Sequence, residues 1–396
     1  MMAGPEAVTS PFPPRARHVR RTVLVLSALC LTAASAAAQK VPKRPELFAG
    51  ADTNSWFAYY QNGLSNLRRR PDLAADAFYW AARLNPSAPE PLYGTWVAYW
   101  KRQPDRFWDY IEGKKFVVES KEVQHIDSLR LKALKRNPMM YQGLWIELFD
   151  DEGPMDMSLD PAVQGIIAYA HGNPVRAAER LGQAVKSKAY RSYRYDRALA
   201  LYQIAQYDTA ANELQLLIDD MKKREEKKLV RMYESKQMFE YGIAIVMLAK
   251  GDTAAARDAL GKALTEDLSF TPAHVELAHL AAATGDTATA IQELSQAAEL
   301  DSTDVTAQYE LGVHLMMQNK TDEATKHLRK AIALEPYYAQ PYYPLAYILE
   351  FDEKNAEAAD MYVAFADRAP RSDEHRAAVA RAHAAELRKA AGAGAP

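Results

Sequence analysis

The chain has 396 residues, of which 48% are hydrophobic and 25% are charged, a composition that excludes wholesale disorder. Its formal net charge of −2 lacks the basic excess of a nucleic-acid-binding protein, so no nucleic-acid partner is expected. This length suits two or three compact domains or one extended array.

Residues 1–38 have the pattern of a Sec-type signal peptide. Four arginines precede the apolar run 23–31, and small residues that include Ala36 and Ala38 stand before Gln39. The apolar run is shorter than the roughly 20 residues that a membrane-spanning helix needs. We therefore expect cleavage after Ala38, with a retained N-terminal anchor as the alternative.

Cleavage has chemical consequences for the rest of the chain. It removes Glu6, four arginines and the single cysteine, Cys30, and changes the formal net charge from −2 to −5. The mature protein then needs no disulfide and no thiolate-bound metal. No other segment has 18 consecutive apolar residues, so no stable membrane insertion is expected after cleavage. The predicted location is periplasmic or secreted.

Residues 39–157 are predicted to form an aromatic-rich helical region. Within it, 55–88 places Ala74, Phe78, Ala81 and Pro86 at positions that a 34-residue unit repeats further along the chain. Between 89 and 157 no register is evident. All six tryptophans fall in this region: Trp56, Trp80, Trp96, Trp100, Trp108 and Trp145. These rings either fill the core of irregular helix pairs or form a platform for sugar rings or a peptide.

The next segments continue the pattern less regularly. Residues 158–226 are predicted to form two divergent units, the first with Ala177, Leu181 and Ala184 in the expected relative positions. Strong helix formers then predict a charged helical insertion at 227–236. A solvated face of mixed charge accounts for this insertion, and a ridge for docking a partner is the alternative.

Residues 237–372 divide into four gapless blocks of 34 residues. Glycine, Asp and Thr recur at the turn inside the first two blocks, where glycine tolerates the left-handed conformation and Asp or Thr caps the next helix. The other columns hold small or apolar residues at helical spacing, as in Ala256, Ala290, Ala324 and Ala358, and in Leu260, Leu294, Leu328 and Tyr362. Each block is therefore predicted to be a helical hairpin.

These blocks resemble the tetratricopeptide repeat, most closely at 305–338, where Leu311-Gly312, Ala324, Leu328 and Pro336 match its pattern. The resemblance implies an all-α fold, a right-handed α-solenoid of antiparallel helix pairs. An open array needs a cap on its last apolar face, which residues 373–391 are predicted to supply as a helix. Residues 392–396 are expected to form a disordered tail.

Signatures of catalysis are missing from the sequence. It contains no phosphate-binding glycine loop, no H-E-x-x-H motif and no G-x-S-x-G elbow. His375 and His383 could share a face of the predicted cap helix, but two turns separate them and a solvated surface explains them better. We expect no enzymatic activity, no cofactor and no metal site.

The resemblance also implies a binding surface. In tetratricopeptide arrays the first helices of successive repeats line a concave groove, which would hold a protein or peptide. Carried onto this chain, the groove positions include aromatic, amide, sulfur and acidic side chains: His279, Tyr309, Met316, Gln340, Tyr343, Tyr347 and Glu350. Core packing is the alternative for Met316, whereas the three tyrosines are favoured as binding residues.

Three functions follow as hypotheses. The favoured one is an exported scaffold or adaptor that mediates protein–protein interactions in the cell envelope without catalysis. The second is an accessory repeat array attached to a glycan-binding or enzymatic region at 39–157. The third is a subunit of an outer-membrane assembly, secretion or polysaccharide-export machine. The partner's identity and the oligomeric state are not predicted.

Overall fold

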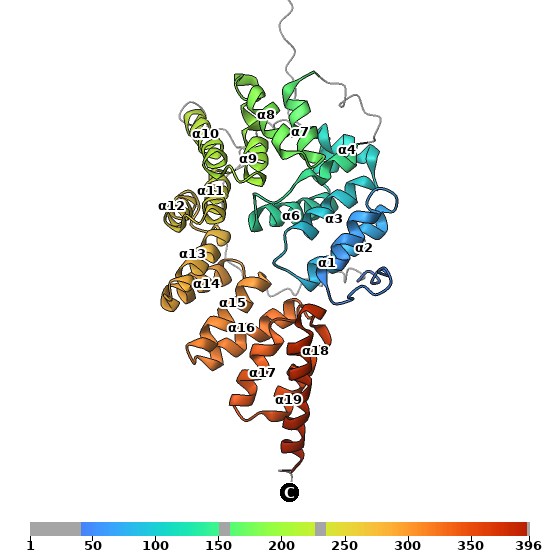
Figure 1. Cartoon of the computed structure of the whole chain (residues 1–396), viewed down its shortest axis with the longest axis vertical. Coiled ribbons are helices and arrows are strands. Elements are labelled where there is room, and N and C mark those ends of the chain that lie inside the picture. The colour runs from blue at the N-terminus through green and yellow to red at the C-terminus, as the bar shows by residue number, and fades with distance from the viewer. Residues whose placement is uncertain (1–40, 150–158, 226–234, 394–396) are drawn as a thin grey trace, which may run out of the picture.

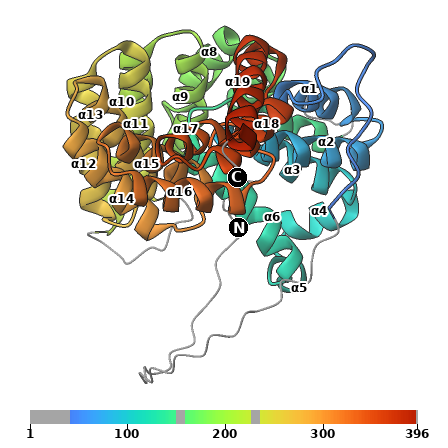
Figure 2. The ribbon, with the colours of Figure 1, turned by 90° about the horizontal axis from the view of Figure 1, so that it is seen from below.

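The computed structural model describes residues 41–149, 159–225 and 235–393. The predicted leader at 1–38 and nearly all of the predicted insertion at 227–236 lie outside these residues. The described residues form helices joined by loops, with no strand among them. The helices follow a curve that returns on itself, so that α1 and α2 come to lie beside the loops next to α16, α17 and α18 (Figures 1 and 2). We call this closed curve the ring.

Four regular hairpins occupy the last part of the array. In each, the two helices pack against one another across a short turn, and the second helix packs against the first helix of the next hairpin. Their helices are α11 (Lys236–Lys250) with α12 (Thr253–Glu266), α13 (Thr271–Ala283) with α14 (Thr287–Leu300), α15 (Val305–Met317) with α16 (Thr321–Leu334), and α17 (Tyr342–Phe351) with α18 (Asn355–Arg368).

The turns inside these hairpins use the expected residues. Gly251 and Gly285 adopt left-handed backbone angles, with φ of 86° and 79°. The carboxylates of Asp252 and Asp286 then accept hydrogen bonds from backbone N–H groups in the first turns of α12 and α14. In the third hairpin Asn319 takes the left-handed position with a φ of 59°. Glycine or asparagine therefore ends the first helix in three hairpins and Glu353, with a φ of 61°, in the fourth, while Asp caps the second helix in two.

Small and branched side chains fill the space between paired helices. The alanines of their column and the three leucines of theirs have no exposed surface, and Tyr362 is 3% exposed. A Cβ atom added to Gly312 would lie 2.7 Å from Cγ of Leu328, so the two helices approach too closely for a side chain there. The columns that define the period are thus the contacts that hold each hairpin together.

The aromatic-rich region contains two hairpins of unequal regularity. The first pairs α1 (Trp56–Asn66) with α2 (Pro71–Leu84), over the span in which a repeat was predicted. The second pairs α3 (Glu90–Lys101) with α6 (Lys121–Arg136), and it carries α4 (Pro104–Ile111) and α5 (Lys115–Val118) between its two helices. A 3-10 helix, η1 (Gly143–Leu148), follows α6.

Three of the six indole rings in this region are buried in the core. Trp80, Trp96 and Trp100 are 4%, 7% and 0% exposed, and Tyr59 and Tyr93 are buried as well. Trp96 donates a hydrogen bond to Asp127 across the α3–α6 pair at 3.0 Å. Trp56 and Trp145 are half-buried, and Trp108 has 52% of its surface exposed. The interpretation of these rings as core filling therefore applies to three of the six.

The middle of the chain forms two further hairpins, and a last helix closes the array. They comprise α7 (Pro161–Ala170) with α8 (Pro174–Ala184), and α9 (Arg194–Gln203) with α10 (Tyr207–Glu225), with the 3-10 helix η3 (Lys188–Tyr193) between them. After a short 3-10 turn, η4 (Arg371–Asp373), helix α19 (Glu374–Ala393) packs along α18. It extends two residues into the segment 392–396 predicted as a tail, and residues 394–396 lie outside the described chain.

Candidate partner-binding surface

The first helices of the hairpins form one continuous surface, which we call the first-helix face. Its central stretch is built by α9 and α11 and its C-terminal stretch by α13, α15 and α17, and it is extended by α19, whose Arg376 and His383 contact Tyr343 and Glu350 of α17. Six of the seven predicted groove residues lie on these helices, and Gln340 lies in the loop just before α17. They differ sharply in how accessible they are.

Tyrosine recurs at the fifth position of three repeats, and each ring meets another group of the same chain. The hydroxyl of Tyr241 donates to the backbone carbonyl of Arg136 at 3.1 Å. Tyr309 meets Tyr338 edge to face, with 5.7 Å between ring centroids. Arg376 lies over the ring of Tyr343, 4.1 Å from its centroid. These tyrosines therefore contribute to the internal structure of the protein.

Tyr347 is the most exposed of the predicted tyrosines, with 56% of its surface accessible. One turn further along α17, Phe351 is 66% exposed, and Met317 at the end of α15 is also 66% exposed. Met316, by contrast, is half-buried against the core of the C-terminal hairpins. The accessible apolar surface of this face therefore centres on Tyr347, Phe351 and Met317.

His279 links two adjacent first helices through carboxylates. Its Nε2 lies 2.7 Å from Glu310 on α15, and its Nδ1 lies 3.3 Å from Glu276 on α13. Hydrogen bonds to Glu276 and Glu310 raise the pKa of His279 to about 10. The imidazole is therefore protonated near neutral pH and joins α13 to α15 as a cation between two acids.

Glu350 is also engaged within the chain. Its carboxylate lies 2.8 Å from Nε2 of His383 on α19 and accepts a hydrogen bond from the Tyr362 hydroxyl at 2.9 Å. Burial has the largest effect in raising the pKa of Tyr362, and the hydrogen bond to the Glu350 carboxylate raises it further. Glu350 therefore holds α19 against the last hairpin. Only the lone pairs that these two contacts leave free are available to a partner.

The chain itself occupies the equivalent surface of the central hairpins. Residues 136–142, which we call the inner segment, lie against α9 and α11, the first helices of those hairpins. The hydroxyl of Tyr195 on α9 donates to the carbonyl of Pro138, and the amide of Gln142 donates to the Tyr195 hydroxyl at 2.9 Å. Met139 is 1% exposed in the central core. Figure 1 shows α6, which leads into this segment, inside the curve of the array.

Sequence reasoning had not found Tyr195, Tyr241 or the inner segment. Tyr241 stands at the fifth position of its repeat, as Tyr309 and Tyr343 do, so the repeat alignment contained a signal for it. Nothing comparable marked the inner segment, because it lies within 89–157, where no register is evident. The predicted groove is thus filled in the central hairpins and accessible in the C-terminal ones.

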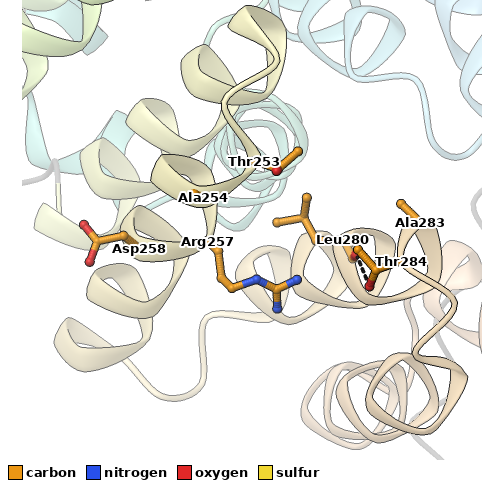
Figure 3. A pocket seen from close by; sticks show the side chains of 7 residues that line it. All are labelled: Thr253, Ala254, Arg257, Asp258, Leu280, Ala283 and Thr284. Atoms are coloured by element: carbon orange, nitrogen blue, oxygen red, sulfur yellow. Dashed lines mark hydrogen bonds between the residues drawn. The ribbon is translucent and has the colours of Figure 1, made fainter.

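The described residues contain no group of three or more His, Cys, Asp or Glu side chains that could hold a metal ion. Within the same residues, no helix combines the length and apolar character needed to cross a membrane. A depression of about 570 Å³ lies between α12 and α13, where Arg257 extends toward Ala283 and Thr284 (Figure 3). Its α12 side consists of exposed residues, and no unpaired buried group points into it.

Comparison with known proteins agrees with this architecture. The family model described as tetratricopeptide repeat matches residues 163–222, 241–305 and 275–339, which span α7 to α16. The chain contains tetratricopeptide repeats. The predicted all-α solenoid is therefore confirmed, and a role in protein–protein interaction is supported by the repeats. No curated protein matches the sequence.

Solved structures to which parts of this chain are similar include YrrB, described as a tetratricopeptide-repeat protein with an unusual peptide-binding site. It is 20% identical over 52% of this chain and 99% of its own, with a TM-score of 0.39. The C-terminal part of a repeat-containing protein from Cytophaga hutchinsonii is 19% identical over 52% of this chain and 77% of its own, with a TM-score of 0.41. MamA is 23% identical over 38% of this chain and 96% of its own, with a TM-score of 0.30.

Proposed function

We propose that this protein is an exported scaffold that binds a partner protein through the first-helix face of its C-terminal hairpins. The observation that carries the proposal is the contrast between two stretches of that face. The central stretch is covered by residues 136–142 of the same chain, whereas the C-terminal stretch presents Tyr347, Phe351 and Met317 to solvent.

The chemistry of this stretch suits a peptide or helix with apolar anchors. Tyr347 and Phe351 are four residues apart on α17, so they lie on one side of the helix. Exposed aromatic and sulfur side chains form contact surfaces for partner helices, because they bury large areas and adapt to different shapes. No step of covalent chemistry is needed, and binding would be stoichiometric.

In-cell crosslinking tests this proposal. A photoreactive residue at Tyr347 is expected to capture one protein reproducibly, whereas the same residue at Ala356, exposed on the second helix of the hairpin, is not. Tyr343 is a poorer position, because Arg376 covers its ring. Equal capture from both positions, or none from Tyr347 while the protein is folded and present, would refute partner binding at this face.

Export is the second half of the proposal and has a separate test. Its support is the leader pattern of residues 1–38, with Ala36 and Ala38 before Gln39. The mature protein is expected to begin at Gln39 when its N-terminus is sequenced, and alkaline phosphatase fused to its C-terminus is expected to be active. An intact Met1 terminus together with an inactive fusion would disprove export.

The other two hypotheses predict different outcomes. A glycan-binding role for 39–157 would need accessible rings around a cleft, but Trp80, Trp96 and Trp100 are buried. Exposed Trp108 and half-buried Trp56 and Trp145 are the indole rings that a sugar could reach, so fluorescence that ignores added glycan fragments would count further against this role. A role in an outer-membrane machine would be supported if the protein crosslinked from Tyr347 were an outer-membrane barrel.

A further inference from the structure

The loops that join successive C-terminal hairpins form a regular edge of the array. The first residue of each loop recurs every 34 positions: Asp267, Asp301, Glu335 and Ala369. Each acid accepts a hydrogen bond from the backbone N–H two residues later, on Ser269, Thr303 and Tyr337 respectively. The acids therefore stabilise the turns, and in doing so they line one edge with negative charge.

The aromatic-rich region faces this edge with positive charge. Although burial acts to raise it, the pKa of Asp301 is lowered by hydrogen bonds from Thr303 and then by the charges of Lys132 and Lys135 on α6. Further along the edge, both carboxylate oxygens of Glu335 lie 2.9 Å from Nε of Arg83 on α2. These two side chains are only 20% and 12% exposed, so water screens the pair weakly.

The ring closes where α1 and α2 meet the last two loops, through a set of contacts that we call the clasp. Trp80 meets Tyr337 edge to face at 4.9 Å, and the guanidinium of Arg44 lies 4.4 Å from the Trp80 ring. The backbone N–H of Arg371 donates to Asp52 at 2.7 Å. The amide of Asn54 donates to the carbonyls of Asp367 and Ala369 at 2.9 and 3.2 Å.

The clasp differs in kind from the joints between hairpins. Neighbouring C-terminal hairpins share one continuous core of leucine, alanine and aromatic side chains. Trp80 belongs to a separate small cluster with Tyr59 and Leu84, which Tyr337 joins from the other side. None of the substantial helix–helix packings of the described chain joins α1 or α2 to α15–α19. Local opening occurs where the fewest apolar contacts are lost, so the ring should part at the clasp first.

We propose that the clasp is a gate that sets the curvature of the array and thereby regulates how well the first-helix face fits a partner. In the closed state the clasp holds the loops at 335 and 369 against α2 and the segment before α1, and the loop at 301 lies near Lys132 and Lys135 of α6. In the open state, α13 and α15 move away from α6 and its Lys132 and Lys135. This regulation rests on the proposed function, but the opening itself is a property of the chain alone.

Distance measurement between spin labels tests the gate without any partner. Cys30 is the single cysteine, so its replacement by serine leaves Arg69→Cys and Ala356→Cys, both at exposed positions, as the only labelling sites in the full chain. The variants are Arg83→Glu, Glu335→Arg and the two combined. Arg329→Glu is the matched control, because Arg329 pairs with Glu357 at 3.0 Å within the array.

Each single charge reversal is expected to shift the label distances to longer values, and the combined reversal to restore the short ones. The Arg329→Glu control is expected to keep the closed distances. Unchanged distances in both single reversals, or an equal increase in the control, would overturn the gate. Crosslinking from Tyr347 then separates the two proposals: the same partner captured equally in Arg83→Glu and in the native chain would remove the regulation and leave the scaffold intact.

Discussion

The hairpins α1–α2 and α15–α16 solve the same packing problem with different side chains. In both, a glycine of the first helix lies under a large residue of the second: Gly63 under Phe78, and Gly312 under Leu328. Gly63 precedes Phe78 by 15 residues, whereas Gly312 precedes Leu328 by 16. The glycine of the aromatic hairpin therefore stands one position later in its repeat. The same contact between a glycine and a large side chain can therefore form with different side chains and at a different spacing.

The difference extends to the two regions as wholes. The C-terminal hairpins repeat the same alanine and leucine contacts, and each hairpin packs only against the hairpins next to it. The aromatic region instead fills the irregular space around α3, α4 and α6 with rings that have no counterpart in the next hairpin. We expect core substitutions to change the free energy of unfolding by different amounts in these two regions.

The largest effect is expected from Trp100→Ala in the aromatic region. Trp100 has no exposed surface, so its removal should leave a cavity and lower the free energy of unfolding by about 3–5 kcal/mol in denaturant titrations. Trp100→Phe should cost less, because it leaves a smaller cavity and removes a buried indole N–H that has no acceptor among the described residues. If Trp100→Ala lowered the free energy of unfolding no more than Trp100→Phe does, the surrounding core would be shown to fill the space that the indole ring leaves.

The glycine contacts compare the two hairpins directly. A Cβ on Gly63 would lie 2.5 Å from the Phe78 ring, and on Gly312 it would lie 2.7 Å from Leu328. Gly63→Ala and Gly312→Ala should each cost about 1–3 kcal/mol, with the stiffer aromatic contact costing more. Gly261→Ala in α12, where nothing lies within 4 Å, should instead gain about 0.5–1 kcal/mol. Equal melting temperatures for all three variants would contradict the comparison.

Helix caps offer a smaller effect within the regular array. Lys320 precedes α16 with φ −89° and ψ 64°, close to the −88° and 80° of Asp252 before α12, yet only Asp252 supplies a side-chain cap. Lys320→Asp should therefore gain about 1 kcal/mol, and Asp252→Ala should lose about as much. Thermal unfolding measures both, and a destabilised Lys320→Asp would show that the turns are not equivalent.

The smallest effect concerns His279 and pH. Its folded-state pKa of about 10 lies above the ordinary value of 6.5, so the fold binds its proton more tightly than the unfolded chain does. Its contribution to stability is therefore fully present below about pH 6.5 and is lost as pH rises through about 10. The difference in unfolding free energy between the native chain and His279→Gln should shrink from pH 6 to pH 10. A constant difference would exclude protonation as the source.

Part of the fold and of the candidate site was predictable from sequence. Columns such as Ala324 and Leu328 repeat because each hairpin makes the same local contacts, and the Gly-Asp turns mark where helices end. The pairing of α3 with α6 was missed, because α4 and α5 stand between its two helices. Asn137-Pro138 at its end repeats Asn85-Pro86 of the preceding hairpin, a signal that could have indicated it.

The sequence by itself determined the repeating hairpin, its turns and its core columns, because these depend on contacts within about 34 residues. Tertiary structure alone decided which part of the first-helix face stays accessible. Tyr241 and Tyr347 occupy first helices of the same array, yet residue 136 covers one and solvent reaches the other. That outcome depends on the curvature of the whole chain, which brings Arg83 to Glu335 across 252 positions and leaves no trace in any single repeat.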